Sequence, residues 1–369
     1  MSQLQNLLKQ LCPKGVKSAK LGEILDYEQP TPYLVADTDY NDCYDTPVLT
    51  AGQSFILGYT NEKDGIYKAS KENPTIIFDD FTTSFRWVDF DFKVKSSAMK
   101  MLRPKGTDVS FRYVYYAMQC INYETFEHAR QWISKYAQIS IPLPPLEIQQ
   151  EIALILDKFS QLQAELQAEL QARISQYNFY RNHLLNFDGN DDVQWVKLGE
   201  VCEFQRGSVI TQQQATPGGV PVIAGGQKPA YYHNVANKIG KSITVAGSGA
   251  YAGFVAFWNI PIFVSDAFTV NPSDGLDIKY LYYFLKNKQD VIHSLKKGSG
   301  VPHVHGKDLA KISIPIPPLP TQQKIVQILD NFERLVHDIS TGLPAEIHAR
   351  QQQYNFYRNQ LLSFPNLNN

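Results

Sequence analysis

The chain has 369 residues, with 35 basic and 36 acidic side chains and a net charge of −1 at neutral pH. This length accommodates two domains of ordinary size, and a hydrophobic fraction of 43% excludes a disordered or fibrous protein. The charge balance excludes a uniformly basic surface, so nucleic-acid binding would have to use local cationic patches. The four cysteines follow neither a zinc-site nor a disulfide spacing.

The first predicted element is a short amphipathic helix over residues 1–11. Its leucines recur every three or four positions among polar residues, as one face of a helix requires. The segment lacks the continuous apolar stretch of a signal peptide, and no later run is long enough to span a membrane. We therefore expect a cytoplasmic protein.

The most informative feature is an internal duplication. Three blocks of the first half return in the second half in the same order: Lys20–Glu23 as Lys197–Glu200, Ile139–Leu146 as Ile312–Leu319, and Tyr177–Asn182 as Tyr354–Asn359. The stretches between them, about 25–138 and 201–311, share almost nothing. A shared frame with two different inserts suits a molecule that makes one kind of contact twice with different specificity. A duplicated enzyme with one decayed half is the alternative.

Two long helices are predicted to follow the proline-rich blocks. Residues 146–185 contain no Gly or Pro, and their apolar positions recur in steps of three and four, which predicts a rod of roughly 60 Å. Its middle holds the unit Gln-Ala-Glu-Leu twice. The second helix should kink at Gly342-Leu343-Pro344, or break there and restart with Pro344 as its first residue. We expect the two helices to pack antiparallel and to bury stripe residues such as Leu162 and Ile339.

Taken together, these blocks resemble the conserved regions of type I restriction–modification specificity subunits. The repeated I-P-(L/I)-P-P-L block, the Gly342–Glu346 segment, the repeated Y-N-F-Y-R-N and the Lys-Leu-Gly-Glu openings carry the resemblance, which covers nearly the whole chain. It implies an α/β (α+β) fold, duplicated with a pseudo-two-fold arrangement, in which two target-recognition domains are separated by an antiparallel coiled coil of two long helices. The expected bounds are 1–143 and 188–316 for the recognition domains, and 144–187 and 317–369 for the spacer helices.

The resemblance also implies a function. Each recognition domain would read one half of a bipartite, asymmetric sequence in double-stranded DNA, and the helices would set the spacing. Two methyltransferase subunits would dock on the conserved regions, and restriction subunits would join to cut. This chain would be a non-catalytic reader without a cofactor, since S-adenosylmethionine, ATP and Mg would serve adenine-N6 methylation and cleavage in the partner subunits. The alternative is a non-catalytic scaffold that binds methyltransferase subunits without reading DNA.

Three features invite a catalytic or metal-binding interpretation, and each has a simpler explanation. The glycine-rich stretch Ala246–Gly253 lacks the spacing of a dinucleotide or phosphate loop, which favours a turn between strands. Asp80, Asp91 and Lys93 resemble a nuclease carboxylate site, but residues 88–95 alternate as a half-buried strand would. His303 and His305 do not belong to a His/Cys pattern with the spacing of a metal site, so a metal site is not expected.

Candidate contact residues form three groups. In the first half, an acid-free stretch offers cations and hydroxyls for phosphate contacts: Lys93, Lys95, Ser96, Ser97, Lys100, Arg103 and Lys105. In the second half, side chains near predicted turns are candidates for DNA contact: Arg206, Ser208, Gln212, Gln227, Lys228, Ser248, Tyr251, Lys296 and Lys297. The predicted docking surface for the methyltransferase subunits comprises the repeated positions Tyr177, Tyr180, Arg181, Tyr354, Tyr357 and Arg358.

Overall fold

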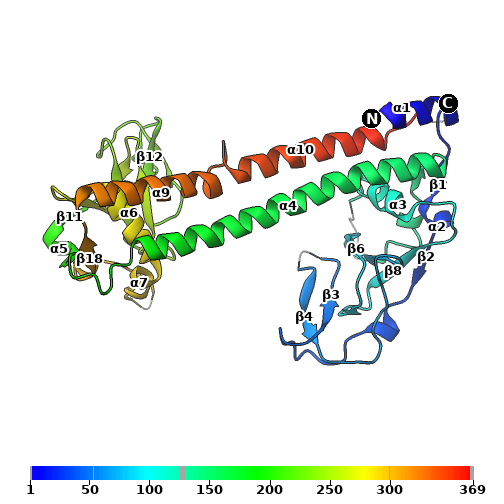
Figure 1. Cartoon of the computed structure of the whole chain (residues 1–369), viewed down its shortest axis with the longest axis horizontal. Coiled ribbons are helices and arrows are strands. Elements are labelled where there is room, and N and C mark those ends of the chain that lie inside the picture. The colour runs from blue at the N-terminus through cyan, green and yellow to red at the C-terminus, as the bar shows by residue number, and fades with distance from the viewer. Residues whose placement is uncertain (1, 53, 125–128, 299, 366–369) are drawn as a thin grey trace. The chain divides into compact units, whose positions relative to one another are not determined.

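The computed structural model describes residues 2–52, 54–124, 129–298 and 300–365 (Figure 1). The chain divides into two compact units, the first made of Met1–Glu165 with His348–Asn369 and the second of Leu166–Ile347. Each unit combines small β-sheets with helices, which confirms the predicted α/β class. The long helix α4 (Leu146–Leu184) begins in the first unit and ends in the second.

The first unit combines short helices with short strands. Its short helical elements are α1 (Ser2–Leu11), α2 (Leu21–Ile24), η1 (Thr31–Tyr33), α3 (Phe111–Met118) and η2 (Tyr136–Gln138). Its strands are β1 (Ser18–Lys20), β2 (Leu25–Glu28), β3 (Thr46–Leu49), β4 (Ile56–Thr60), β5 (Thr75–Asp79), β6 (Phe85–Val88), β7 (Lys93–Val94), β8 (Met99–Pro104) and β9 (Ser140–Pro142). Helix α1 confirms the predicted N-terminal helix.

The second unit repeats this order. Its strands are β10 (Gln194–Lys197), β11 (Cys202–Arg206), β12 (Val220–Ile223), β13 (Tyr231–His233), β14 (Ser242–Ala246), β15 (Val255–Trp258), β16 (Phe263–Val264), β17 (Ala267–Pro272) and β18 (Ser313–Ile316). Its helices are α5 (Leu198–Val201), α6 (Ile278–Asn287), α7 (Gln289–Ser294), α8 (Gly306–Leu309) and α9 (Leu319–His337), and α10 (Leu343–Leu361) leads back into the first unit. The helical stretch from Ile278 to Ser294 consists of two helices, because α6 ends at the C-cap Lys288.

The two units share one sheet topology. A four-stranded sheet has the order β2-β8-β5-β6 in the first unit and β11-β17-β14-β15 in the second. Each unit adds a three-stranded sheet, β4-β3-β7 or β13-β12-β16, and an antiparallel strand pair, β1-β9 or β10-β18. The two inserts therefore share one backbone fold, although their sequences have diverged.

The repeated Lys-Leu-Gly-Glu openings begin the short helices α2 and α5. A Cβ atom on Gly22 would lie 3.2 Å from the Cβ of Ala137, and one on Gly199 would lie 3.1 Å from that of Ala310. Both contacts are tighter than ordinary van der Waals distances, so glycine permits this close approach between the start and the end of each insert. The glycine of the opening motif thus allows the start of each insert to pack closely against its end.

The bounds of the long helices agree closely with the prediction. The predicted burial of residues in their middle does not. Helix α4 has 39 residues, and the second helix breaks into α9 and α10, which begins at Leu343, one residue before the predicted start. The expectation that Leu162 and Ile339 are buried was wrong, because their exposed fractions are 36% and 84%. Ile339 lies in the turn after α9, where Asp338 accepts hydrogen bonds from the next residues of the chain.

Within each unit the paired helices run antiparallel. In the first unit, Phe159 of α4 stacks on Tyr357 of α10 with ring centroids 5.6 Å apart, and Gln163 hydrogen-bonds Gln351 at 2.9 Å. In the second unit, Tyr180 stacks on Phe332 of α9 at 5.4 Å, and Tyr177 contacts His337 at 5.8 Å. None of the helices in the described ranges is both long and apolar enough to cross a membrane.

The predicted strand over 88–95 is wrong in its extent. The structure ends β6 at Val88 and begins β7 only at Lys93, and residues 92–94 are all buried, which breaks the alternation. Phe92 is held by backbone hydrogen bonds to Tyr67, so the chain bends into the three-stranded sheet instead of continuing β6. Sequence periodicity could not reveal this bend because the partner segment lies about 25 residues away.

The first unit contains a buried ion pair whose removal should be costly. Lys100 Nζ lies 3.5 Å from Asp80 Oδ2, with side-chain exposures of 0% and 1%. Burial, partly offset by Asp80, lowers the pKa of Lys100. Asp80→Ala leaves the lysine without its counter-charge, so we expect the unfolding free energy of this unit to fall by about 3–5 kcal/mol in urea titrations.

An exposed ion pair supplies the matched control for this prediction. Lys68 and Asp91 approach within 2.5 Å but have side-chain exposures of 72% and 47%. Asp91→Ala should change the unfolding free energy by about 1 kcal/mol or less, because solvent screens the pair. Equal losses in the Asp80 and Asp91 variants would show that burial does not set the cost.

Candidate nucleic-acid interface

The predicted phosphate-binding stretch of the first unit is largely neutralised by acids from elsewhere in the fold. Lys93 Nζ lies 2.9 Å from Glu62 and donates to the carbonyl of Asp64 at 2.7 Å, and its side chain is 4% exposed. Lys100 is enclosed with Asp80 as described above. Neither ammonium group reaches solvent, so these two residues do not offer a phosphate contact in this conformation.

The other members of that stretch differ in accessibility. Arg103 donates to the Tyr67 hydroxyl at 2.7 Å and is half-buried, and Ser96 accepts a hydrogen bond from the Ala98 amide at 3.1 Å. Lys105 is exposed but lies 3.6 Å from Asp26. Lys95 and Ser97 are exposed, which leaves these two as the most accessible candidates for phosphate contact.

The candidates of the second unit lie on four exposed connections. They lie at the end of β11 and just after it (Arg206, Ser208, Gln212), between β12 and β13 (Gln227, Lys228), between β14 and β15 (Ser248, Tyr251) and after α7 (Lys296, Lys297). The Ala246–Gly253 stretch is the turn between β14 and β15, as predicted. Lys296 Nζ binds the carbonyl of Ala250 at 2.9 Å, which joins the connection after α7 to this turn, and Lys297 pairs with Asp308 at 2.9 Å.

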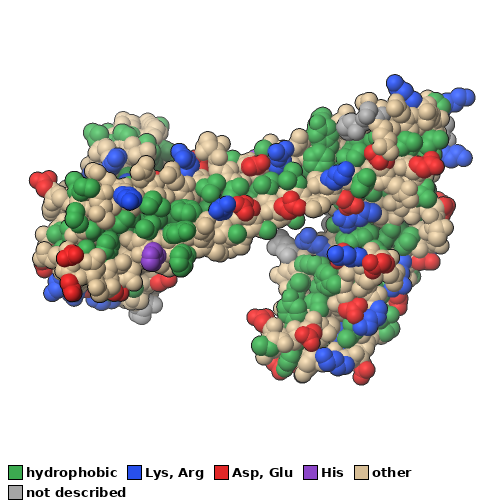
Figure 2. All heavy atoms as spheres, in the orientation of Figure 1, with side chains coloured by type: hydrophobic (Ala, Val, Ile, Leu, Met, Phe, Trp, Pro, Cys, Tyr) green, Lys and Arg blue, Asp and Glu red, His purple; other side chains and the backbone are tan. Residues whose placement is uncertain are grey.

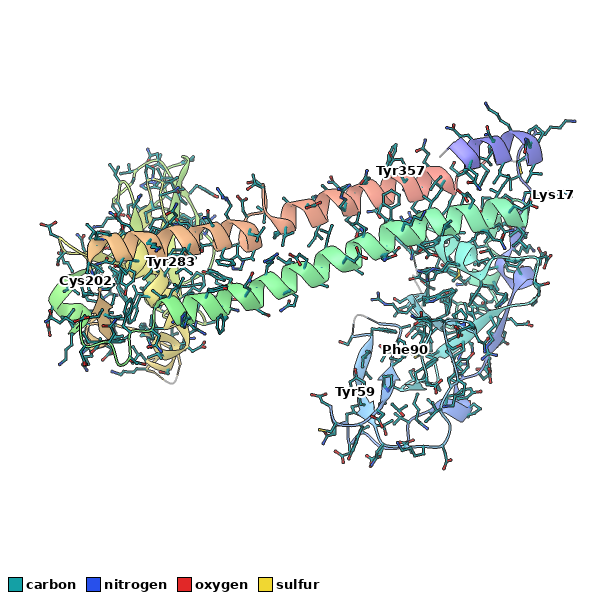
Figure 3. The ribbon with its side chains drawn as sticks, in the orientation of Figure 1. Lys17, Tyr59, Phe90, Cys202, Tyr283 and Tyr357 are labelled. Carbon is teal, nitrogen blue, oxygen red and sulfur yellow. The ribbon has the colours of Figure 1, made fainter. Side chains whose placement is uncertain are left out.

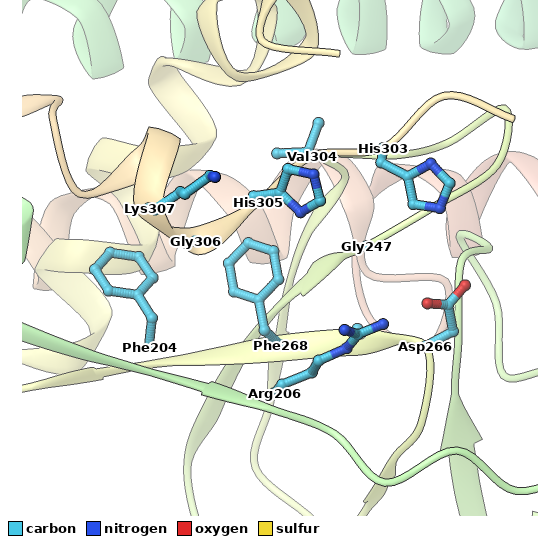
Figure 4. Close-up of a pocket in the computed structure, with 11 residues that line it drawn as sticks. Phe204, Arg206, Gly247, Asp266, Phe268, His303, Val304, His305, Gly306 and Lys307 are labelled. Carbon is cyan, nitrogen blue, oxygen red and sulfur yellow. The ribbon is translucent and has the colours of Figure 1, made fainter. Parts of the chain in front are cut away.

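A cavity of about 400 Å³ is lined by one of these candidates, Arg206. In Figure 4 the guanidinium of Arg206 extends toward the carboxylate of Asp266, and the imidazoles of His303 and His305 face them from the other side. The rings of Phe204 and Phe268 also line the cavity, and Lys307 lies at one end. Ser248 donates a hydrogen bond to Asp266 Oδ2. Asp266 was not predicted from the sequence because it belongs to no motif.

The alternative catalytic and metal interpretations find no support in the geometry. Asp80, Asp91 and Lys93 belong to three different ion pairs, with Lys100, Lys68 and Glu62 respectively. Among the described residues, no three His, Cys, Asp or Glu side chains gather as a metal site would require. On the face shown in Figure 2, acidic and basic side chains are interspersed over both units, with no large patch of one sign.

A duplicated polar clamp, which was not predicted from the sequence, ties each insert to its long helix. In the first unit the Tyr116 hydroxyl donates to Asp157 at 2.6 Å, and Arg112 pairs with the same carboxylate at 2.6 Å. In the second unit Tyr283, labelled in Figure 3, donates to Asp330, and Lys279 pairs with it at 2.7 Å.

A second tyrosine in each unit adds a further hydrogen bond to the clamp, and burial keeps the tyrosine hydroxyl groups protonated. Tyr113 and Tyr280 donate to the carbonyls of Pro142 and Pro315 at 2.8 and 3.0 Å. Burial raises the pKa of Tyr116 and Tyr283, so both hydroxyls keep the proton they donate. The signal was present in the sequence as Arg-Tyr-x-x-Tyr in α3 and Lys-Tyr-x-x-Tyr in α6.

Comparison with known proteins decides the family. A model of the type I restriction modification DNA specificity domain matches residues 13–176 and 190–349. The specificity subunit of the Escherichia coli type I restriction enzyme EcoR124I/EcoR124II is 42% identical across 99% of this chain and 98% of its own. The chain belongs to the type I restriction–modification specificity subunits.

Further relatives agree with this family. A putative type I specificity subunit of Haemophilus influenzae is 31% identical over 85% of this chain and 86% of its own. The crystal structure of a type I S subunit from M. genitalium superposes with a TM-score of 0.66 at 16% identity, covering 94% of this chain and 96% of that one. At that identity the superposition shows a shared fold.

The predicted docking residues of this specificity subunit are mostly engaged within their own units. Tyr177 and Tyr354 are buried, with exposures of 2% and 6%. Arg181 and Arg358 are half-buried, and each lies over the ring of one of these tyrosines, at 5.1 and 5.5 Å. Of the tyrosines, Tyr180 is the more open, with 37% exposure, whereas Tyr357 is half-buried.

The repeated segment also exposes two phenylalanines that were not predicted as contact residues. Phe179 and Phe356 occupy equivalent positions in the two copies, and each is 64% exposed. Two large apolar side chains left in solvent at equivalent positions are typical of a contact made twice. A sequence pattern could not separate them from their buried tyrosine neighbours without the helix orientation.

Proposed function

We propose that each unit of this specificity subunit reads one half of a bipartite, asymmetric DNA sequence. The observation that carries the proposal is the combination of a duplicated frame with two different surfaces. The sheet order, the glycine contacts and the tyrosine clamps recur in both units, whereas the stretches between the repeated blocks share almost no sequence. Identical frames give both units the same mode of contact, and different loops give them different specificity.

The proposal extends to partners. Two methyltransferase subunits would bind, one at each copy of the repeated segment, and restriction subunits would complete the nuclease. S-adenosylmethionine, ATP and Mg²⁺ would be bound by those partners in the cytoplasm, and this chain would supply recognition without chemistry of its own. The equal exposure of Phe179 and Phe356 supports two equivalent docking positions.

Methylome sequencing tests the function directly. Methylated adenines would be mapped in the host with and without the gene for this chain. We expect a two-part asymmetric methylation motif that disappears on deletion and returns when the intact gene is restored. An unchanged methylome would contradict DNA reading. In that outcome the chain would be a scaffold that binds methyltransferase subunits without selecting a sequence.

Partner docking makes a separate prediction at the two exposed phenylalanines. Phe179→Ala and Phe356→Ala should each weaken co-purification of the methyltransferase subunit, by roughly tenfold in affinity if the rings are anchors of the interface. Because both rings are exposed, the thermal stability of the isolated chain should stay near that of the wild type.

The buried neighbours provide the control for docking. Tyr177→Ala and Tyr354→Ala remove rings that are packed inside their units, so each should cost about 3–5 kcal/mol of stability. Unchanged co-purification in the two phenylalanine variants would remove them from the interface. A fall in melting temperature with these variants would assign them a packing role instead.

A further inference from the structure

The cavity of the second unit has a structural counterpart in the first. The amide of Asp80 donates to the carbonyl of Ala98 at 2.9 Å, as Gly247 does to Asp266 at 3.1 Å. The carbonyl of Asp80 then accepts from Gln131 at 2.8 Å, as that of Gly247 accepts from Val304 at 3.0 Å. These matched bonds make Asp80 equivalent to Gly247, Ala98 to Asp266, and Trp132 to His305.

In the first unit this position is filled. The Asp80 carboxylate accepts hydrogen bonds from the amides of Gln131 and Trp132, at 3.1 and 2.7 Å, and pairs with Lys100. Lys100 Nζ also donates to Gln29 at 2.9 Å, and Gln29 is the counterpart of Arg206. The Trp132 ring is 2% exposed and packs against Phe78 with centroids 5.0 Å apart. The two charges are therefore paired with each other and buried.

In the second unit the same position is open. Gly247 provides no side chain where Asp80 stands, and His305 is exposed where Trp132 is buried. Arg206 is exposed on β11, the edge strand of its sheet. The ion pairs identified among the described residues include none between Arg206 and Asp266, although the two side chains extend toward each other (Figure 4). The unit thus presents a cation and a carboxylate side by side to solvent.

The carboxylate of Asp266 restricts the kinds of ligand that this cavity can bind. Ser248 occupies Asp266 Oδ2, which orients the group and leaves Oδ1 to accept a further hydrogen bond. A phosphate would be repelled by this carboxylate, whereas the major-groove edge of a G·C base pair suits both groups. Guanine N7 and O6 accept from an arginine, and the adjacent cytosine amino group donates to a carboxylate.

We propose that this cavity reads a G·C base pair, with Arg206 donating to guanine and Asp266 accepting from cytosine. The inference rests on the proposed function, because it assigns one base pair within the half-site that the second unit reads. His303, His305 and Lys307 add positive or polar groups around the pair and hold the nearby backbone of the DNA. The first unit reads its half-site without an equivalent pair, since its own Asp80 and Lys100 are enclosed.

The test uses the assembled methyltransferase complex and compares the methylation motifs of Asp266→Asn and Arg206→Gln with that of the wild type. We expect each variant to lose discrimination at one G·C position of one half-site, roughly tenfold to a hundredfold for a lost base contact. The other half-site and the gap should not change. Lys307→Ala serves as the control and should weaken methylation at all sites alike, with a smaller dependence on salt.

The outcomes of this test distinguish failure of the base-reading proposal from failure of the proposed function. Unchanged motifs in both variants, with normal melting temperatures, would overturn base reading by this cavity. A uniform loss of methylation in Asp266→Asn and Arg206→Gln, with no change of motif, would assign the cavity to DNA backbone contact and also overturn the proposal. Absence of any bipartite motif in the wild type would instead contradict the proposed function itself.

Discussion

Insertion of one further Gln-Ala-Glu-Leu unit after Leu170 should lengthen the unread gap between the half-sites by about one base pair. Four residues extend α4 by about 6 Å and rotate the C-terminal part of the helix by about 40°. DNA rises about 3.4 Å per base pair, so the extension corresponds to fewer than two base pairs before any tilt is considered. None of the side chains from 161 to 172 is buried, and Leu170, which precedes the insertion, lies partly buried at the edge of the core of the second unit. Methylome mapping of the variant reads the gap directly.

A two-residue insertion at the same point is the matched control. It rotates the C-terminal part of α4 by about 200°, so its apolar stripe turns to the opposite face. The first part of α4 packs in one unit and the last part in the other, with Ile152 and Tyr177 both buried. The segment formed by α9 and α10 also connects the two units, so such a rotation of α4 would strain this second connection, and we expect methylation to be lost. An unchanged gap with full activity in the four-residue variant would show that α4 does not set the spacing.

Local patterns in the sequence were sufficient for the elements whose structure depends on nearby residues. The three-and-four spacing predicted α4 almost to its ends, and Gly342 and Pro344 marked the break between α9 and α10. The helix break is set by backbone chemistry within a few residues, which a sequence displays directly. Burial along the stripe was predicted wrongly, because the exposure of Leu162 depends on the residues that lie across from it.

The predicted contact residues failed where their partners are distant in the sequence. The stretch around Lys93 and Lys100 contains no acid, yet Glu62 and Asp80 reach both lysines from other parts of the fold. An acid-free sequence segment therefore need not form a basic surface. Conversely, Asp266 follows no motif, and only the pairing of β11 with β17 brings it near Arg206. Charge neutralisation and cavity formation are tertiary properties in both cases.

The tyrosine clamps define how a recognition insert can be exchanged. Within residues 25–138, Tyr113 reaches the carbonyl of Pro142, and Arg112 and Tyr116 reach Asp157, both outside the insert. Ala137 packs against Gly22 at the opening. A donor insert from another family member must therefore supply equivalents of these four side chains in order to pack against the rest of the unit.

Replacing Leu25–Gln138 with such a donor insert should exchange one half-site completely and leave the other half-site and the gap unchanged. The reason is that the donor contacts the frame through the same clamp, so α4 and the second unit keep their own packing. A donor insert in which the equivalents of Arg112 and Tyr116 are replaced by Met and Phe is the control. It should carry the same new half-site but lose stability, because Asp157 loses both of its partners. Methylome mapping of the two chimaeras separates the effect of the insert on DNA recognition from its effect on packing against the rest of the unit. Alteration of both half-sites by the intact donor would show that the units do not read DNA independently, and the duplicated frame would then have to couple them.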